Sequence, residues 1–306
     1  MLRLTFLGLV SAFALFALPS QLSAGEEETV TGLHSLPEVE FSALSSPDPN
    51  PLGAQALALH PEQWKHGETE HFIYHFVHSY VATPVSVEAE FCFRVITEQR
   101  GQETTAAGSA KSHIYIFEKP ADWLAFQSRA ELEPWTGGIH SQGSLFIVRD
   151  PAYKFTNNSL GHEIAHLVLF RIYQRPPPLW LNEGFAEYTS RLARASYQRA
   201  RNYIAHPHSA PIPHEQLIPL AQLTAIGAYP SGDIAVFYRE SERLVRFLVG
   251  VDRTAFFSFL DAMAQGEHFN SALSRNYRGR FSDLDALEKE FVVYASETAK
   301  TIGAPN

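Results

Sequence analysis

The sequence predicts an α+β fold in which a small mixed sheet with its helices is followed by a mainly helical part. Three observations predict it. Short runs rich in β-branched and aromatic residues alternate with helical patterns over residues 69–175. Residues 234–298 carry apolar side chains at helical spacing, with glycines where helices should stop, which predicts helices at 234–249, 254–265, 269–277 and 283–298. Near the end of the first part an H-E-x-x-H run, residues 162–166, lies inside a helical pattern.

Residues 1–24 have the features of an export signal. Arg3 provides a short basic region, Leu4–Leu18 is almost entirely apolar, and small residues precede a cleavage site after Ala24. The apolar run is short for a membrane span of about 20 residues, and an uncleaved N-terminal anchor is the alternative. We therefore expect a secreted or periplasmic protein of bacterial type, with no stable membrane span after signal cleavage.

The net charge and the cysteine content indicate which kinds of function and cellular compartment to expect. The net charge of −9 gives no reason to expect nucleic acid binding. The only cysteine is Cys92, so no internal disulfide can form, which suits a bacterial exported protein with a large apolar core. Cys92 itself is expected to be a buried apolar filler.

Residues 25–68 are predicted to be a flexible linker. Glu26–Glu28 is acidic, and residues 45–51 read Ser-Ser-Pro-Asp-Pro-Asn-Pro, a turn-rich stretch that can bury little apolar surface.

The predicted N-terminal lobe, residues 69–175, begins with a strand over 69–79. Its histidines His71, His75 and His78 suggest a second metal site, but strand alternation turns His78 away from the other two. Polar positions on a sheet are the preferred alternative. The remaining elements predicted before the H-E-x-x-H run are a helix, a strand, a helix and a strand, at 83–99, 112–117, 120–130 and 143–148.

The H-E-x-x-H run has the spacing of a metal site. Two helical histidines four residues apart, His162 and His166, lie about 40° apart around the axis and about 6 Å along it. Both imidazoles can therefore reach one tetrahedral metal. Glu163 projects about 100° from His162, which is wrong for a ligand but suitable for taking a proton from a water on that metal. The alternative is a helix with two chance histidines.

A catalytic zinc site requires a third protein ligand and an open position for water. Glu183 lies in a second helical pattern that opens after Pro176–Pro178, and an antiparallel helix could present it to the histidines. Gly184 costs about 1 kcal/mol in a helix relative to alanine, and we expect it to allow close approach of these two helices. Glu187 can accept the second N–H of a metal-bound histidine, or it is a solvated helix carboxylate.

These residues resemble a known family. The H-E-x-x-H run followed by Trp-Leu-Asn-Glu-Gly-Phe-Ala at 180–186 is similar to the gluzincin zinc metallopeptidases, in wording closest to their aminopeptidase branch. The short linker and C-terminal part resemble the small bacterial peptidase MA-like domains. The resemblance extends loosely over residues 69–298 and is specific at 162–188. It implies a zincin-like fold with the metal-binding helix in the N-terminal lobe and a mainly helical C-terminal lobe over residues 176–300.

The same resemblance implies zinc as the cofactor, with His162, His166 and Glu183 as ligands and Glu163 as general base and acid. Two departures limit what it implies. The ligand spacing is slightly shorter than in the best-known gluzincins, and the G-x-M-x-N motif that holds a substrate N-terminus is absent. Residues 135–139, Trp-Thr-Gly-Gly-Ile, stand roughly in its place. Aminopeptidase specificity therefore does not carry over.

Two further features of the family bear on mechanism. Residues 237–241 resemble the peptidase MA-like pattern, which makes Tyr238 the candidate to stabilise the oxyanion, with Tyr229 in reserve; either is otherwise a core tyrosine. By resemblance, residues 137–147 include the edge strand that pairs with an extended peptide. His140 could then contact substrate, or it is an ordinary loop histidine.

We therefore expect a zinc-dependent metallopeptidase that acts on a peptide or protein substrate. Two alternatives stay open. One is a catalytically silent exported binding domain on a zincin scaffold. The other is a zinc hydrolase of non-peptide amides or esters, because zinc-activated water does not dictate the acyl group.

Overall fold

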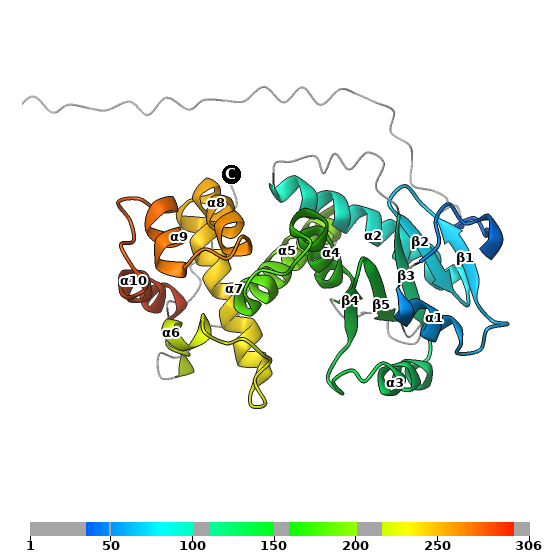
Figure 1. The fold of residues 1–306 in the computed structure, drawn as a ribbon. Helices are drawn as coiled ribbons and strands as arrows, with labels where there is room; N and C mark the ends of the chain where they lie inside the picture. The colour runs from blue at the N-terminus through cyan, green and yellow to red at the C-terminus, as the bar shows by residue number, and fades with distance from the viewer. Residues whose placement is uncertain (1–34, 49, 101–110, 150–158, 201–215, 297–306) are drawn as a thin grey trace, which may run out of the picture. The chain divides into compact units, whose positions relative to one another are not determined.

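The structure, a computed structural model, shows an α+β fold, as the sequence predicts (Figure 1). The residues it describes are 35–48, 50–100, 111–149, 159–200 and 216–296. The predicted signal segment, residues 1–24, lies outside them. Across the described ranges no helix combines the length and the apolar character needed to cross a bilayer.

Five strands form one mixed sheet in the order β1-β2-β3-β5-β4. The three central strands, β2 (Phe72–Phe76), β3 (Ser112–Phe117) and β5 (Ser144–Val148), run parallel and are almost wholly buried. Burial on both faces explains their near-continuous apolar sequences. Short antiparallel strands, β1 (Lys65–Glu68) and β4 (Gly138–Ser141), form the two edges. The predicted strand over 112–117 is confirmed to the residue, and β2 and β5 lie inside the other two predicted ranges.

The flexible linker predicted over residues 25–68 is wrong for its described part. A short 3-10 helix, η1 (Phe41–Ala43), is followed by helix α1 (Pro51–Leu57) and by edge strand β1. The Asn50 side chain caps α1 by accepting the N–H of Leu52 at 2.9 Å, and Pro51 occupies the first helical position. The proline-rich stretch is therefore the start of a helix rather than a solvated spacer.

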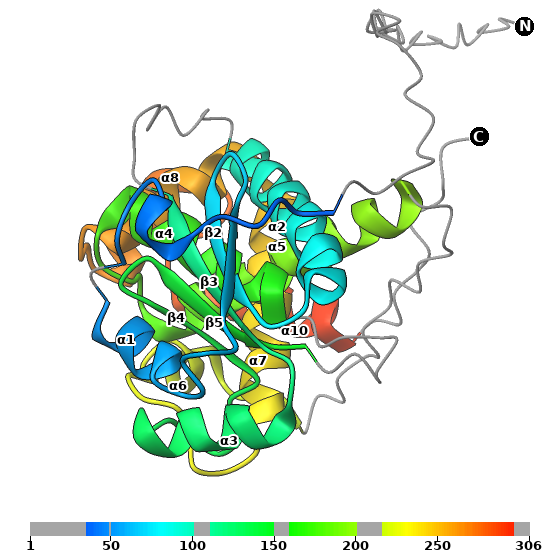
Figure 2. The same cartoon turned by 90° about the vertical axis from the view of Figure 1, so that its right-hand side faces the viewer.

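Helices cover both faces of the sheet (Figure 2). Helix α1 and helix α3 (Pro120–Arg129) cover one face, where Phe117 and Phe146 pack against Trp123 and Phe126. The other face packs against α2 (Ser79–Arg100) and α4 (Ser159–Tyr173), and α5 (Leu179–Ala200) packs on both of these helices. The predicted helix 83–99 lies within α2, and Cys92 is buried there with a raised thiol pKa caused by burial.

The C-terminal part of the described chain is helical, as predicted. Helix α7 packs along α5, and Figure 1 shows the remaining helices beyond α7, away from the sheet. Asp233 and Asp252 cap α7 and α8 through backbone N–H groups three residues on. The described helices here are α6 (Leu220–Leu223), α7 (Ile234–Val251), α8 (Arg253–Ala264), α9 (Phe269–Asn276) and α10 (Leu284–Ser296). The last four, α7 to α10, correspond in order to the helices predicted at 234–249, 254–265, 269–277 and 283–298.

Gly184 allows α5 to lie directly against α7. A Cβ added at this position would lie 2.4 Å from the backbone oxygen of Ser241, closer than real Cβ atoms come to anything. The sequence predicted this close approach between α5 and the preceding helix, which is wrong: the tight contact is with α7. The looser α4–α5 approach occurs at Gly161, where an added Cβ would lie 3.4 Å from the Cβ of Ser190.

Replacing Gly184 by alanine should destabilise the protein by about 1–3 kcal/mol, because the new methyl group forces two helix backbones apart. Urea denaturation of metal-free protein measures the change. The matched control is Gly250→Ala, another helical glycine but in α7, where nothing lies within 4 Å of the added Cβ. That variant should gain about 0.5 kcal/mol of helix propensity; equal losses in both variants would contradict the close-packing explanation.

The histidines of the first predicted strand do not converge on one metal. His71 contacts Glu90, with its Nδ1 atom 2.6 Å from Oε2. His78 contacts Glu118 at the same distance. His75 alone is fully buried, at 1% exposure. The suggestion of a second site on this strand is therefore not supported, and the preferred interpretation, polar positions on a sheet, describes them.

His75 is the middle of a buried row of three imidazoles. Its Nδ1 atom lies 2.8 Å from Nδ1 of His66, and its Nε2 atom lies 2.9 Å from Nδ1 of His113. The ring of Tyr115 stacks on His75, with the two centroids 4.3 Å apart. Burial lowers the pKa of all three histidines, and mutual repulsion between the imidazolium forms lowers the pKa of His75 further.

This row should make the fold acid-sensitive. A histidine whose folded pKa lies below its unfolded value of about 6.5 binds fewer protons folded than unfolded, so stability is lost as pH falls through and below that value. Urea midpoints should therefore decrease from pH 7.5 to pH 5. The decrease should be smaller in His75→Phe than in the control His60→Gln, at a half-exposed position. The same decrease in both variants would exclude the row as the cause.

Candidate metal centre

Three side chains from two helices converge at one point. His162 and His166 come from α4 and Glu183 from α5, and one ligand atom of each lies within 4.8 Å of the other two. Oε2 of Glu183 is 3.2 Å from Nε2 of His162 and 3.5 Å from Nε2 of His166. The two Nε2 atoms are 2.9 Å apart. The structure thus brings together the three residues that the sequence singled out as ligands.

This geometry fits a tetrahedral zinc ion. Zinc bonds to nitrogen and oxygen of about 2.0–2.1 Å at tetrahedral angles place neighbouring ligand atoms about 3.3 Å apart, close to the separations among these three atoms. Glu183 is only 1% exposed, and its Oε2 atom has no well-aligned hydrogen-bond donor. A buried carboxylate needs a compensating charge, which the imidazolium forms of the two histidines, or a cation bound between the three atoms, would supply.

Each of the three side chains has a partner on the side away from the convergence point. Nδ1 of His162 lies 3.2 Å from Oε1 of Glu187, the contact that the sequence predicted for this carboxylate. Nδ1 of His166 lies 3.2 Å from Oδ1 of Asn182. Such contacts fix the tautomer of an imidazole so that the other nitrogen presents its lone pair. Sequence reasoning missed Asn182, although its place directly before Glu183 in the W-L-N-E-G-F-A run was the available signal.

The third partner is Tyr229, whose hydroxyl donates to Oε1 of Glu183 at 2.8 Å. The ring of Tyr238 lies beside that of Tyr229, with the two centroids 6.3 Å apart. Tyr238 also lies beside the histidines, with its ring centroid 6.0 Å from that of His162. Both tyrosines therefore belong to the surroundings of the centre, but it is the reserve candidate, Tyr229, that contacts a proposed ligand.

Glu163 is separate from the three converging atoms yet electrostatically coupled to them. It is 6% exposed and does not belong to the group of ligand atoms. Burial raises its carboxyl pKa and the Glu183 charge raises it further, while His162 and His166 lower it; the net shift is upwards. A carboxylate with a raised pKa takes up a proton more readily than an ordinary one, which suits a general base.

Within the centre, the pKa shifts caused by neighbouring charges oppose the pKa shifts caused by burial. Burial alone would lower the pKa of His162, but contacts with Glu183 and Glu187 outweigh it and hold that pKa well above its ordinary value. Burial alone would raise the pKa of Glu183, but the histidines His166 and His162 lower it strongly. Glu183 is therefore ionised at neutral pH, which is the form that binds a cation.

The edge strand beside the centre is β4, not the strand predicted at residues 143–148. That strand, β5, is interior because β4 pairs with its free side. The edge still lies within residues 137–147. His140 is on β4, so the loop assignment is wrong; its ring packs against Phe170, and its Nε2 atom accepts the N–H of Gly143 at 3.2 Å. Burial and the neighbouring His166 lower the His140 pKa to about 3.

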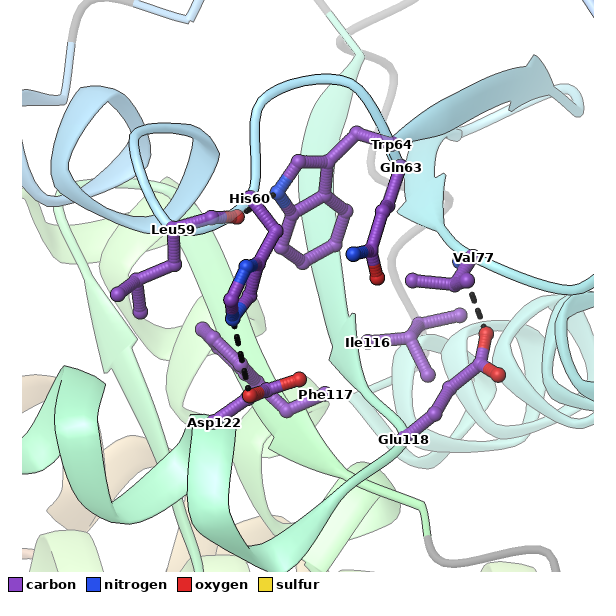
Figure 3. Close-up of a pocket in the computed structure, with 9 residues that line it drawn as sticks. All are labelled: Leu59, His60, Gln63, Trp64, Val77, Ile116, Phe117, Glu118 and Asp122. Carbon is purple, nitrogen blue, oxygen red and sulfur yellow. Dashed lines mark hydrogen bonds and ion pairs between the residues drawn. The ribbon is translucent and has the colours of Figure 1, made fainter.

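A second recess lies on the other face of the sheet, where Figure 3 shows His60 directed towards Asp122, and Glu118 towards the backbone of Val77. The Glu118 carboxylate in this recess already accepts hydrogen bonds from the backbone N–H groups of Val77 and His78. The cavity of about 10 Å³ has room for about one water. This recess therefore has a structural role, and the functional candidate is the centre on α4 and α5.

No protein-family model matches the chain, and no curated protein matches it either. The candidate centre is therefore argued from the geometry of its own residues. The sequence predicts an exposed proline-rich loop for His206, His208 and His214, with the border of a cleft as the alternative, and these residues lie outside the described ranges.

Purified protein should bind one zinc ion, and His162→Ala or Glu183→Ala should each lose it, because two of the three ligands hold zinc poorly. Glu187→Gln should weaken zinc binding by about tenfold through the outer contact to His162. Competition with a chromophoric chelator measures these affinities. His60→Ala, outside the centre, is the control. Unchanged zinc affinity in either ligand variant would refute that ligand assignment.

Proposed function

We propose that this protein is a zinc-dependent metallopeptidase of the gluzincin type. The observation that carries the proposal is the convergence of His162, His166 and Glu183, with Glu163 buried beside them and not among the ligand atoms. A metal site with no acid–base group next to it would fit a structural role equally well. A buried carboxylate with a raised pKa beside three ligands is the arrangement that hydrolysis requires.

In this proposal each residue of the centre has a separate role. His162, His166 and Glu183 would hold the zinc, which when bound polarises the scissile carbonyl and acidifies water. Glu163 takes a proton from the attacking water and delivers it to the leaving amine, two steps that its raised pKa suits. Tyr238 is the candidate donor to the tetrahedral oxyanion. Burial and the Glu183 charge raise its phenol pKa, which keeps the donating proton on the oxygen at neutral pH.

Tyr229 receives a different role from the one the sequence suggested. Its hydroxyl donates to Oε1 of Glu183, so it orients that carboxylate and leaves Oε2 directed at the histidines. A residue that acts through a ligand is a positioning residue, so Tyr238, the first candidate, keeps the proposed oxyanion role and Tyr229 is no longer its reserve.

The edge strand favours a peptide substrate over the non-peptide alternative. In the part of the chain that the structure describes, strand β4 has a strand neighbour on one side only and packs against α4, the helix that carries Glu163. An extended peptide added beside β4 would therefore run past the proposed base. Backbone pairing of this kind holds a peptide with little demand on its sequence. Together with the export signal expected at residues 1–24, this supports a secreted or periplasmic peptidase.

Replacing Glu163 by glutamine should preserve zinc binding and abolish hydrolysis, because the amide keeps the shape of the side chain and cannot accept the proton. The loss in kcat should be at least about 100-fold. Digestion of a broad peptide library, read by mass spectrometry with and without a chelator, measures it alongside zinc content.

The matched control is Glu62→Gln, at an exposed carboxylate outside the centre, which should stay active. Normal cleavage by Glu163→Gln would remove the proposed base. Zinc-loaded wild-type protein that cleaves no peptide would support the binding-domain alternative.

A further inference from the structure

Three aromatic side chains, Trp135, Tyr229 and Tyr238, form a cluster beside the metal centre. Trp135 stands edge-on to both tyrosines, with ring centroids 5.2 Å from Tyr229 and 6.4 Å from Tyr238. The two tyrosine rings lie 6.3 Å apart and nearly parallel. Although aromatic, Trp135 and Tyr229 are 45% and 43% exposed. Large exposed aromatic surface that is gathered in one place marks a binding surface more often than a scattered apolar residue does.

Hydrogen bonds fix the backbone next to the exposed Trp135 side chain. Its neighbour Thr136 is fixed through its backbone oxygen, which accepts hydrogen bonds from Nε1 of Trp123 at 3.1 Å and Nε2 of Gln127 at 2.8 Å. The N–H of Thr136 donates to the backbone oxygen of Glu133 at 3.0 Å, closing a turn. Helix α3 therefore fixes the backbone beside Trp135, and the Trp135 side chain remains 45% exposed.

The cluster connects the two structures that would handle a peptide. On one side, the Tyr229 hydroxyl bonds Glu183 and the Tyr238 ring lies 6.0 Å from the His162 ring. On the other side, Trp135 is followed within three residues by the start of edge strand β4 at Gly138. A peptide lying along β4 with its scissile bond at the metal would pass the three rings.

We propose that this cluster, Trp135, Tyr229 and Tyr238, binds an aromatic or large aliphatic side chain adjacent to the scissile bond. The inference deepens the proposed function and rests on it. The rings meet one another edge-to-face and face-to-face, an arrangement that a further ring can join. The Tyr229 hydroxyl is already committed to Glu183, so the cluster offers mainly apolar surface. The substrate class is therefore a peptide with an aromatic or bulky aliphatic residue at the cleavage position.

The first test compares two peptides that are identical except for one position beside the cleaved bond, phenylalanine in one and glycine in the other. The wild type should prefer the phenylalanine peptide in kcat/KM by about tenfold or more, the range of discrimination that an apolar site provides. Trp135→Ala should reduce this ratio by about tenfold, and Trp135→Phe should retain most of it. The matched control is Leu124→Ala, an apolar side chain on α3 that is 61% exposed, which should leave the ratio unchanged.

The second test separates this inference from the proposed function. Fluorescein-labelled versions of the two peptides are titrated into zinc-loaded Glu163→Gln protein, and anisotropy reports binding without hydrolysis. Tighter binding of the phenylalanine peptide, lost in Glu163→Gln/Trp135→Ala, supports the cluster even if the wild type cleaves nothing. Equal binding and equal cleavage of both peptides overturn the inference and leave the peptidase intact. An unchanged selectivity ratio in Trp135→Ala also overturns it.

Discussion

The rest of the site depends on one buried carboxylate held against two imidazoles. Removing Glu183 from water is unfavourable unless its charge is compensated, and at 1% exposure almost no solvent remains to do so. The fold compensates it with His162 and His166 on one oxygen and the Tyr229 hydroxyl on the other. The histidines lie on α4 and the carboxylate on α5, so the three side chains can meet only if these two helices are held in a fixed position relative to each other.

Close helix packing provides that rigidity. Helix α5 lies between α4 and α7, and a glycine permits each approach, Gly161 in α4 and Gly184 in α5. Because Gly184 directly follows Glu183, the contact with the backbone of α7 fixes the ligand's own backbone. Helix α5 also carries Asn182 and Glu187, which hold the far nitrogens of the two histidines. One helix thus supplies a ligand and the supports of both others, so the geometry is set before any metal or substrate binds.

The sequence predicted the features that rest on local periodicity and failed where distant contacts decide. The C-terminal helices, strand 112–117 and the three candidate ligands all follow from spacing along the chain. The short edge strands β1 and β4 are only four residues each and gain their structure by pairing with β2 and β5, which no local pattern shows. The helix after Asn50 was hidden among prolines that usually indicate a loop. The partner of Gly184, the His66–His75–His113 row and the Tyr229–Glu183 bond all join residues distant in sequence, so the tertiary fold alone determines them.

The central claim is that His162, His166 and Glu183 bind one cation together. X-ray absorption at the zinc edge, on stoichiometrically loaded protein, tests it most directly. The account predicts scattering from two imidazole rings and a total of about four nitrogen or oxygen ligands at about 2.0–2.2 Å, and Glu183→Ala should no longer hold zinc stoichiometrically. A spectrum with fewer than two imidazoles, or one that Glu183→Ala leaves unchanged, would contradict it.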